Sequence, residues 1–210
     1  MDDYYEMYKV ELENDKDGNT FAYELLDDDT YMIMPSTIVS KKLTIPSTYK
    51  GKKISMVAHD YGYERPIGSD SLEELIISEG IEIIDAQVFF FYTALKNVKI
   101  ASSVTTIGDS AFGYCTSLTS INIPSGTKYI KNDAFSRCSN LKSISLPNSL
   151  ISIGNLAFSY CEKLEEITLP ESLEEIGEYV FDFCDSLKRI NYNGKKLKNE
   201  NYKFNTNLIN

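Results

Sequence analysis

The chain has 210 residues, of which 42% are hydrophobic and 12% aromatic, a composition that predicts a packed interior and excludes wholesale disorder. The formal net charge is −10, and residues 1–30 carry −9 of it, because eleven acidic residues accompany only Lys9 and Lys16 there. The one basic cluster lies in the tail, whereas nucleic-acid binders show a basic stripe, so we expect no nucleic-acid partner. No apolar run reaches the ~18 residues of a membrane helix, so we expect no membrane insertion.

The first segment, residues 1–42, reads as strands joined by turns. The stretches YKVELEN, TFAYELL and TYMIM are separated by the acidic turns DKDGN and DDD. This pattern predicts an antiparallel β-hairpin or meander. We expect it to cap the open apolar end of the repeats that follow, because stacked repeats need a polar end to stay soluble.

The first turn also resembles part of a calcium-binding loop. Glu13, Asp15 and Asp17 alternate, Gly18 stands at position six, and Glu24 stands at position twelve. The first position holds Glu where the motif has Asp, and the flanks read as strands. A D-G hairpin turn explains the same residues, and we prefer that interpretation.

The opening residues, MDDYYEMYKV, contain neither the positive region nor the apolar region of a signal peptide. From this we expect either a cytosolic protein or a mature fragment with an added Met1. The cysteines do not separate these two possibilities.

From residue 72 to residue 194 the chain repeats every 23 residues. Leucine, phenylalanine and cysteine each return at this interval in columns of their own, namely Leu72, Leu95, Leu118, Leu141, Leu164 and Leu187; Phe89, Phe112, Phe135, Phe158 and Phe181; and Cys115, Cys138, Cys161 and Cys184. A fixed apolar period of this length predicts a solenoid, in which each repeat is one coil stacked on the next. Residues 43–71 match the strand template at LTIP but are longer than one period, so we expect an irregular first coil. Residues 195–210 lack the template and read as a C-terminal cap or tail.

Each coil has a recognisable internal order. The segment L-x-x-I-x-I alternates inward isoleucines such as Ile121 with outward polar residues and ends at a proline such as Pro124, which predicts a strand. The I-G step, as at Gly154, predicts a corner that needs either positive φ or a close backbone approach. The segment A-F-x-x-C-x-x-L predicts one short helical or 3-10 turn with its apolar side inward.

The four cysteines occupy one repeat column. Equivalent residues of stacked coils lie about 4.8 Å apart with parallel side chains. A disulfide needs Cβ atoms at about 3.8 Å that converge, so this ladder fits disulfides poorly. We therefore expect buried free thiols that act as small apolar side chains.

The template is carried most cleanly by residues 141–164, LKSISLPNSLISIGNLAFSYCEKL, and residues 43–54, LTIPSTYKGKKI, add a matching first coil. These segments resemble the BspA-like leucine-rich repeat family. The resemblance implies a leucine-rich-repeat solenoid, α/β by convention but β-rich, with one strand and one short turn per coil. It also implies a cell-surface or secreted protein of the kind that includes adhesins. The shared motif is structural, so no catalytic site transfers with it.

An enzyme is not expected. The only histidine, His59, lies in the irregular first coil, no glycine-rich loop is suited to phosphate, and the paired glutamates read as solvated surface. We therefore predict no catalytic residues, no metal site and no cofactor.

Two surfaces are candidate binding sites for a protein or a glycan. The first, which we name the strand face, is formed by the outward positions of the predicted strands on a concave sheet: Asn97, Lys99, Ser120, Asn122, Ser143, Ser145, Glu166, Thr168, Arg189 and Asn191. The second, which we name the aromatic row, precedes the cysteine column: Phe91, Tyr114, Arg137, Tyr160 and Phe183. Plain solvated surface explains the first set and a stabilising ladder explains the second, so both alternatives stay open.

The sequence thus predicts a non-catalytic protein- or glycan-binding module of a cell-surface or secreted protein, with a role in adhesion or host interaction. The alternative is a structural spacer, a stretch of solenoid that supplies length within a larger surface protein and has no ligand of its own.

Overall fold

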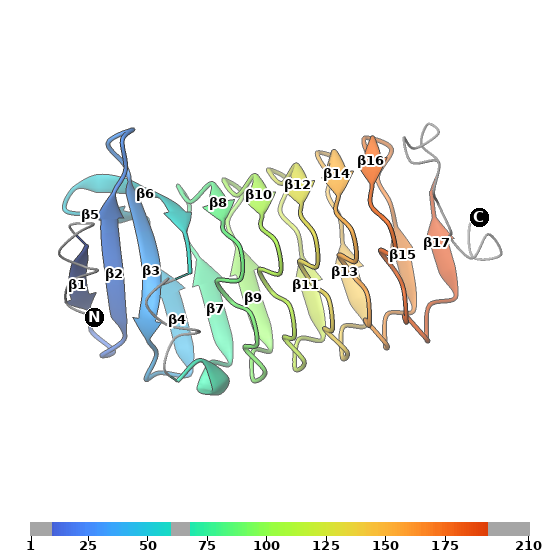
Figure 1. The fold of residues 1–210 in the computed structure, drawn as a ribbon, viewed down its shortest axis with the longest axis horizontal. Helices are drawn as coiled ribbons and strands as arrows, with labels where there is room; N and C mark the ends of the chain where they lie inside the picture. The colour runs from blue at the N-terminus through green and yellow to red at the C-terminus, as the bar shows by residue number, and fades with distance from the viewer. Residues whose placement is uncertain (1–9, 60–67, 193–210) are drawn as a thin grey trace.

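The structure is a computed structural model that describes residues 10–59 and 68–192. These residues form an elongated stack of parallel coils, with the N-terminal strands at one end and β17 at the other (Figure 1). Residues that lie 23 positions apart in the sequence pair with each other in neighbouring coils, as Ile121 pairs with Ile144. The predicted leucine-rich-repeat solenoid is confirmed.

The strands of the coils form two rows along the stack (Figure 1). The first row consists of β4 (Lys42–Ile45), β7 (Glu74–Ile77), β9 (Asn97–Ile100), β11 (Ser120–Asn122), β13 (Ser143–Ser145), β15 (Glu166–Thr168) and β17 (Arg189–Asn191). The second row consists of β6 (Lys52–Val57), β8 (Ile83–Ile84), β10 (Thr106–Ile107), β12 (Tyr129–Ile130), β14 (Ser152–Ile153) and β16 (Glu175–Ile176). Pairing is parallel within both rows. The first row matches the strands expected from the sequence. The short strands of the second row, at the corners of the coils, were not predicted.

The segment after the second strand differs in detail from the expected helical turn. Within the described stretches the one helix is a 3-10 helix, η1 (Ser69–Ser71). In a typical coil, Ser110 and Tyr114 have left-handed backbone, with φ of 53° and 60°, and these interrupt any run of helical dihedrals. The segment is therefore a series of turns, closed by bonds such as Cys115 N–H to Phe112 O at 3.3 Å.

These turns still contribute to the stack. In each coil, alternate backbone N–H groups point to the next coil, where Phe112 N–H donates to Ala134 O and Phe135 N–H to Ala157 O, both at 2.8 Å. The turn segment thus supplies a third line of hydrogen bonds between coils, beside the two strand rows. In this way the neighbouring coil satisfies buried backbone donors of the turn segments, from Gln87 to Tyr160.

The core consists of the predicted columns. Phe89, Phe112, Phe135 and Phe158 are fully buried, and their rings stack with Phe181 in one continuous pile with centroid separations of 5.3–5.8 Å. Stacked rings of this kind stabilise by about 0.5–1.5 kcal/mol per pair beyond the area that they bury. The leucine column is buried in the same core.

The cysteines are free, as expected, and Cys184 alone is half-buried. Each thiol donates a hydrogen bond to the carbonyl oxygen of the phenylalanine one coil earlier, at Sγ–O distances of 3.1–3.4 Å. Burial raises the pKa of the Cys138 thiol to about 12, and that of Cys184 to about 12 as well. The column therefore packs as neutral thiols.

The I-G corner is explained by close backbone approach and not by positive φ. A Cβ atom on Gly154 would lie 2.5 Å from the backbone nitrogen of Asn132 in the preceding coil, and one on Gly177 would lie 2.3 Å from the nitrogen of Asn155. Both distances are too short for any real Cβ contact. Glycine therefore lets the coils approach at this corner.

A ladder of side chains seals the same corner. The Asp109 carboxylate accepts the backbone N–H of Asn132, the Asn132 amide oxygen accepts that of Asn155, and the Asn155 amide oxygen accepts that of Glu178, at 2.7–3.0 Å. Each side chain thus satisfies a backbone donor of the next coil. The ladder holds the four coils in register at their tightest point.

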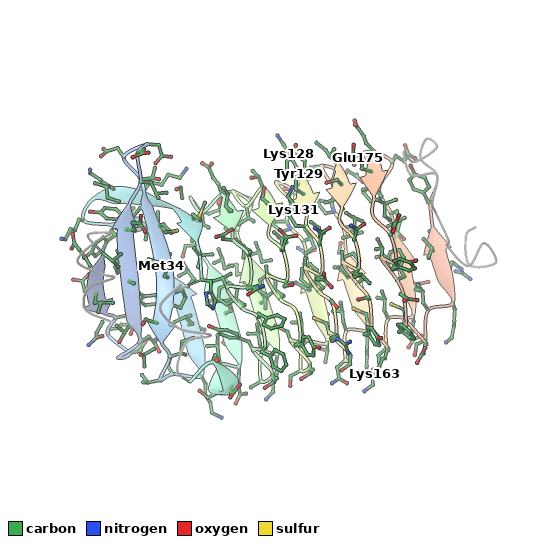
Figure 2. The ribbon with its side chains drawn as sticks, in the orientation of Figure 1. Met34, Lys128, Tyr129, Lys131, Lys163 and Glu175 are labelled. Carbon is green, nitrogen blue, oxygen red and sulfur yellow. The ribbon has the colours of Figure 1, made fainter. Side chains whose placement is uncertain are left out.

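The N-terminal strands β1 (Glu11–Asn14), β2 (Thr20–Leu25) and β3 (Tyr31–Thr37) form the expected antiparallel meander. β3 then pairs in parallel with β6, so the meander continues the second row of the solenoid. The short β5 (Thr48–Tyr49) pairs with β6 and brings Tyr49 onto Tyr23, with ring centroids 3.7 Å apart. β3 is buried on both faces, since Ile33 belongs to the main core and Met34 packs with Ala22 on the other side (Figure 2).

The turn between β1 and β2 is the predicted hairpin turn. Asp15 accepts three hydrogen bonds through its carboxylate, from Asp17 N–H, Asn19 N–H and the Asn19 amide, at 2.8–2.9 Å, and Gly18 has a φ of 83°. The buried Asn19 amide also accepts N–H groups of Val39 and Ser40. The turn is therefore tied to the chain that enters the first coil.

Replacing Phe135 by Ala should lower the free energy of unfolding by about 3–5 kcal/mol, because it opens a cavity in the middle of the ring stack. Chemical denaturation followed by circular dichroism measures this difference. The matched control is Tyr179→Ala, at a ring that is 60% exposed, which should change stability by less than about 0.5 kcal/mol. A loss below about 1 kcal/mol at Phe135 would contradict the packing described.

The thiols should react far more slowly in the folded protein than in the unfolded one. The thiolate is the nucleophile, and burial holds the pKa of all four thiols above the usual value. With iodoacetamide at pH 8, peptide mass mapping should find Cys184 alkylated first, because it is the half-buried one. Rapid labelling of Cys138 before unfolding in urea would be incompatible with this core.

Candidate functional site

The residues of the strand face lie where the sequence analysis placed them, at the outward positions of β9, β11, β13, β15 and β17. All are exposed except Asn191, which is half-buried. Parallel register sets them in two lines, with Ser120 opposite Ser143 and Asn122 opposite Ser145. β9 lies beside β11 and β13 beside β15, so the lines continue from coil to coil (Figure 1).

The chemistry of the strand face changes along the stack. The middle coils present small hydroxyl and amide side chains, while the last coils present charges, with Arg189 3.9 Å from Glu166. The Asn191 amide donates to the Thr168 hydroxyl at 3.4 Å. The face can therefore donate and accept hydrogen bonds at fixed intervals without carrying a large net charge.

Two shallow hollows lie on this face. One, of about 270 Å³, is lined in part by Ser143, Ser145, Glu166 and Thr168. The other, of about 570 Å³, lies nearer the C-terminal end, between Thr168, Asn191 and residues that the sequence analysis did not select, such as Asn148 and Tyr192. Asn148 follows the strand-ending Pro147, whereas Tyr192 directly follows β17, in the column that holds Leu146 and Leu169 in earlier coils.

The aromatic row is a continuous stack. The Phe91 and Tyr114 rings are 4.3 Å apart, the Arg137 guanidinium lies 5.2 Å from the Tyr114 ring and 4.1 Å from the Tyr160 ring, and Tyr160 and Phe183 are 4.4 Å apart. The two end rings are the most exposed, with 37% of Phe91 and 53% of Phe183 accessible. The structure thus brings all five predicted residues together.

The row is built on unusual backbone. All five of its members have left-handed φ between 54° and 65°, a conformation that costs a residue other than glycine about 1–2 kcal/mol. Ring stacking and cation–π contact stabilise the fold by about 0.5–1.5 kcal/mol for each pair. The free-energy cost of the left-handed backbone and the stabilisation from side-chain stacking are therefore of similar size. Stacking on both sides holds the side chains of the row in place.

A further group of polar side chains was not singled out in the sequence. On β12 and just after it, the Lys131 ammonium lies 5.1 Å from the centre of the Tyr129 ring, and Lys128 and Glu175 stand near them on the same edge (Figure 2). Equivalent positions hold Thr106 and Ser152, so the feature is confined to one coil. It does not form a line along the stack.

The remaining candidates concern metal ions and the membrane. There, no three side chains of the histidine, cysteine, aspartate or glutamate type come close enough to hold a metal ion. Asp15, the middle of the calcium-like spacing, uses its carboxylate to close the hairpin turn. Within the same stretches no helix is long and apolar enough to span a membrane. The lysines of the tail, Lys195, Lys196, Lys198 and Lys203, lie outside the described residues.

The repeats agree with a known family. The BspA type leucine rich repeat region matches six copies over residues 67–188 and 128–210, well over half of the chain. The chain belongs to the BspA type leucine rich repeat family. No curated protein matches the sequence.

Solved structures of bacterial leucine rich repeat proteins share the fold. A leucine rich repeat protein of T. pallidum, TpLRR, is 29% identical with a TM-score of 0.61, over 82% of this chain and 68% of that chain. The pneumococcal vaccine antigen PcpA is 21% identical with a TM-score of 0.68, over 86% of this chain and 49% of that one. A leucine rich cell surface protein of Faecalibacterium prausnitzii A2-165 is 23% identical with a TM-score of 0.58, over 88% and 55%. The chain spans about half the length of the last two.

In this BspA type repeat chain, one ion-pair network borders the strand face. The Glu73 carboxylate lies between Lys41 and Lys96 of the two flanking coils, at 2.6 and 2.7 Å. Hydrogen bonds from these two ammonium groups lower the pKa of Glu73 to about 2. All three groups are solvated, so the network contributes only modestly to the free energy of unfolding.

Changing Glu73 to Gln should lower the melting temperature slightly at neutral pH and have no effect in strong acid. The folded pKa lies below the unfolded value of about 4.3, so the carboxylate stabilises the fold above pH ~4.3 and loses this effect as the pH falls toward 2. Differential scanning calorimetry from pH 7 to pH 2 should show the difference between native and E73Q protein shrinking. The control is Glu175→Gln, and a difference for E73Q that grew on acidification would refute the assignment.

Proposed function

We propose that this chain is a non-catalytic interaction module, displayed on or outside a cell, that binds a protein or a glycan through the strand face. The observation that carries the proposal is the pair of hollows on that face, both lined by residues at repeat positions. The two lines of small polar side chains supply donors and acceptors around them. A rigid frame holds these groups at fixed spacing, so little ordering entropy is lost on binding.

Family membership supports a surface location. One similar structure is described as a leucine rich cell surface protein and another as a vaccine antigen. Both descriptions concern those proteins, and they favour a surface or secreted protein with a role in adhesion or host interaction here.

The spacer alternative draws support from a different observation. The second strand row is hydrogen-bonded from β6 to β16 without a break, and the turn segments add a parallel line of bonds, which makes the stack suitable for holding other segments apart. A spacer needs no ligand, and its exposed residues would be interchangeable. The two proposals therefore differ in what substitution of the strand face does.

The test uses two double variants of equal charge. Native protein is passed over immobilised fibronectin, laminin, collagen and mucin glycans, and the surface that retains it becomes the probe. Ser143→Glu with Ser145→Glu should weaken binding at least tenfold, because two new charges must lose water at the contact. The control pair, Thr106→Glu with Ser152→Glu on the second strand row, should bind normally.

Both double variants should melt within about 2 °C of the native protein, since surface substitutions change stability little. Equal weakening by both pairs would point to a general charge effect and refute the strand face as the contact. A protein retained by none of these surfaces would favour the spacer.

A further inference from the structure

The left-handed backbone does not explain which residue types occupy the aromatic row. A second column has the same left-handed φ, between 53° and 59°, four residues before each member of the row. Its members are Gln87, Ser110, Asp133, Leu156 and Tyr179, which share no chemical type. The aromatic row, under the same constraint, holds a ring or a guanidinium in every coil. A property of the side chains themselves therefore accounts for it.

The order of groups along the row is symmetric. Phenylalanine occupies both ends, tyrosine occupies the next positions inward, and Arg137 stands at the centre. The row thus has a polar middle, with one guanidinium and two hydroxyls, between two exposed apolar rings. A ladder needed only for stability would gain as much from a fifth ring at the centre as from a cation.

The polar middle has unused hydrogen-bonding capacity. Neither the Arg137 guanidinium nor the hydroxyls of Tyr114 and Tyr160 donate to any residue in the described stretches, and no carboxylate there lies within 4.0 Å of Arg137. Burial raises the pKa of Asp133 and the positive charge of Arg137 partly opposes this rise, but the two side chains form no ion pair. The guanidinium is planar, so when its face stacks on the neighbouring rings its N–H groups point outward in its own plane, toward the edge of the stack.

This geometry favours a carboxylate ligand over a sugar ring. Sugars pack on the open faces of aromatic rings, yet the faces of Tyr114 and Tyr160 are covered by Arg137 and by the neighbouring rings. What remains accessible is a set of donors flanked by apolar ring edges. Arginine pairs with carboxylates through two parallel hydrogen bonds, and arginine and tyrosine are frequent in the centres of protein interfaces.

The spacing of the row indicates the conformation of the ligand. Each end ring stands two coils from Arg137, which is about 9.6 Å at the ordinary strand spacing. In a polyproline II segment, residues three apart lie on one side and are separated by about 9.3 Å. In a β-strand, residues three apart point to opposite sides, so that conformation does not fit.

We propose that the aromatic row binds a polyproline II segment of a partner protein that carries an acidic residue, with apolar residues three positions before and after it. The acidic side chain accepts hydrogen bonds from Arg137 and the two tyrosine hydroxyls. The apolar side chains pack against Phe91 and Phe183. The site is separate from the strand face, and its test does not depend on the function proposed for that face.

The probe is the blocked peptide Leu-Pro-Pro-Glu-Pro-Pro-Leu, whose prolines hold the required conformation. Titration calorimetry with the native protein should show saturable binding below about 1 mM. The same peptide with Gln for Glu should bind at least tenfold more weakly, and so should Leu-Pro-Glu-Pro-Leu, in which the spacing is wrong. In nuclear magnetic resonance spectra the Nε–H signal of Arg137 should shift on binding.

The decisive variant is Arg137→Phe, which continues the ring stack while removing the donors. It should fold with a melting temperature equal to or above that of the native protein and lose at least tenfold in affinity for the Glu peptide. Tyr114→Phe and Tyr160→Phe should each lose about two- to tenfold, as expected for one hydrogen bond. The matched control, Tyr129→Phe on β12, lies outside both surfaces and should bind normally.

Several results would overturn the proposal. These are no saturable binding below about 1 mM, equal affinity for the Gln peptide, or unchanged affinity in Arg137→Phe, each of which would leave the row a structural ladder. Displacement of the peptide by sialyllactose or a hyaluronan fragment with higher affinity would assign the site to an anionic sugar instead.

Discussion

The molecule depends on coils that stack in register. One coil is too thin to bury its own interior, so Phe135 is covered by Phe112 on one side and Phe158 on the other, and its backbone N–H bonds to the next coil. Register makes the exterior equally regular, because any outward position becomes a line of side chains. The strand face and the aromatic row are thus consequences of the same constraint that builds the core.

Register also determines how polar groups are accommodated. The Asn132 amide and the Cys138 thiol are tolerated because the neighbouring coil supplies a backbone partner at a constant offset. Where the repeat ends, the solution changes. At the N-terminal end the buried Asn19 makes several different hydrogen bonds to hold the meander against the chain that enters the first coil. At this end, the hydrogen bonds of the single residue Asn19 replace the repeated side-chain ladder that joins the middle coils.

Much of this was predictable from the sequence, because a period of 23 residues turns sequence spacing directly into contact. The ring stack, the thiol column, the strand face and the order of the aromatic row follow from that period alone. The second strand row did not, since strands of two residues such as Ile130 and its neighbour leave no alternating pattern. The left-handed positions were also hidden, because residues such as Leu156 and Tyr160 normally avoid that conformation. The hollows depend on side-chain placement at Asn148 and Tyr192, which the repeat does not specify.

The hydrogen bonds between coils have one further consequence. Because Gly154 meets Asn132 in the same way that Gly177 meets Asn155, the coils that meet at these two corners have equivalent junctions. Duplicating a 23-residue unit in the gene would lengthen the protein by one step without demanding new complementary surfaces. If the duplicated unit lay between Arg137 and one end of the aromatic row, the phenylalanine at that end would move one coil farther from the arginine, which would change the ligands that can span the row.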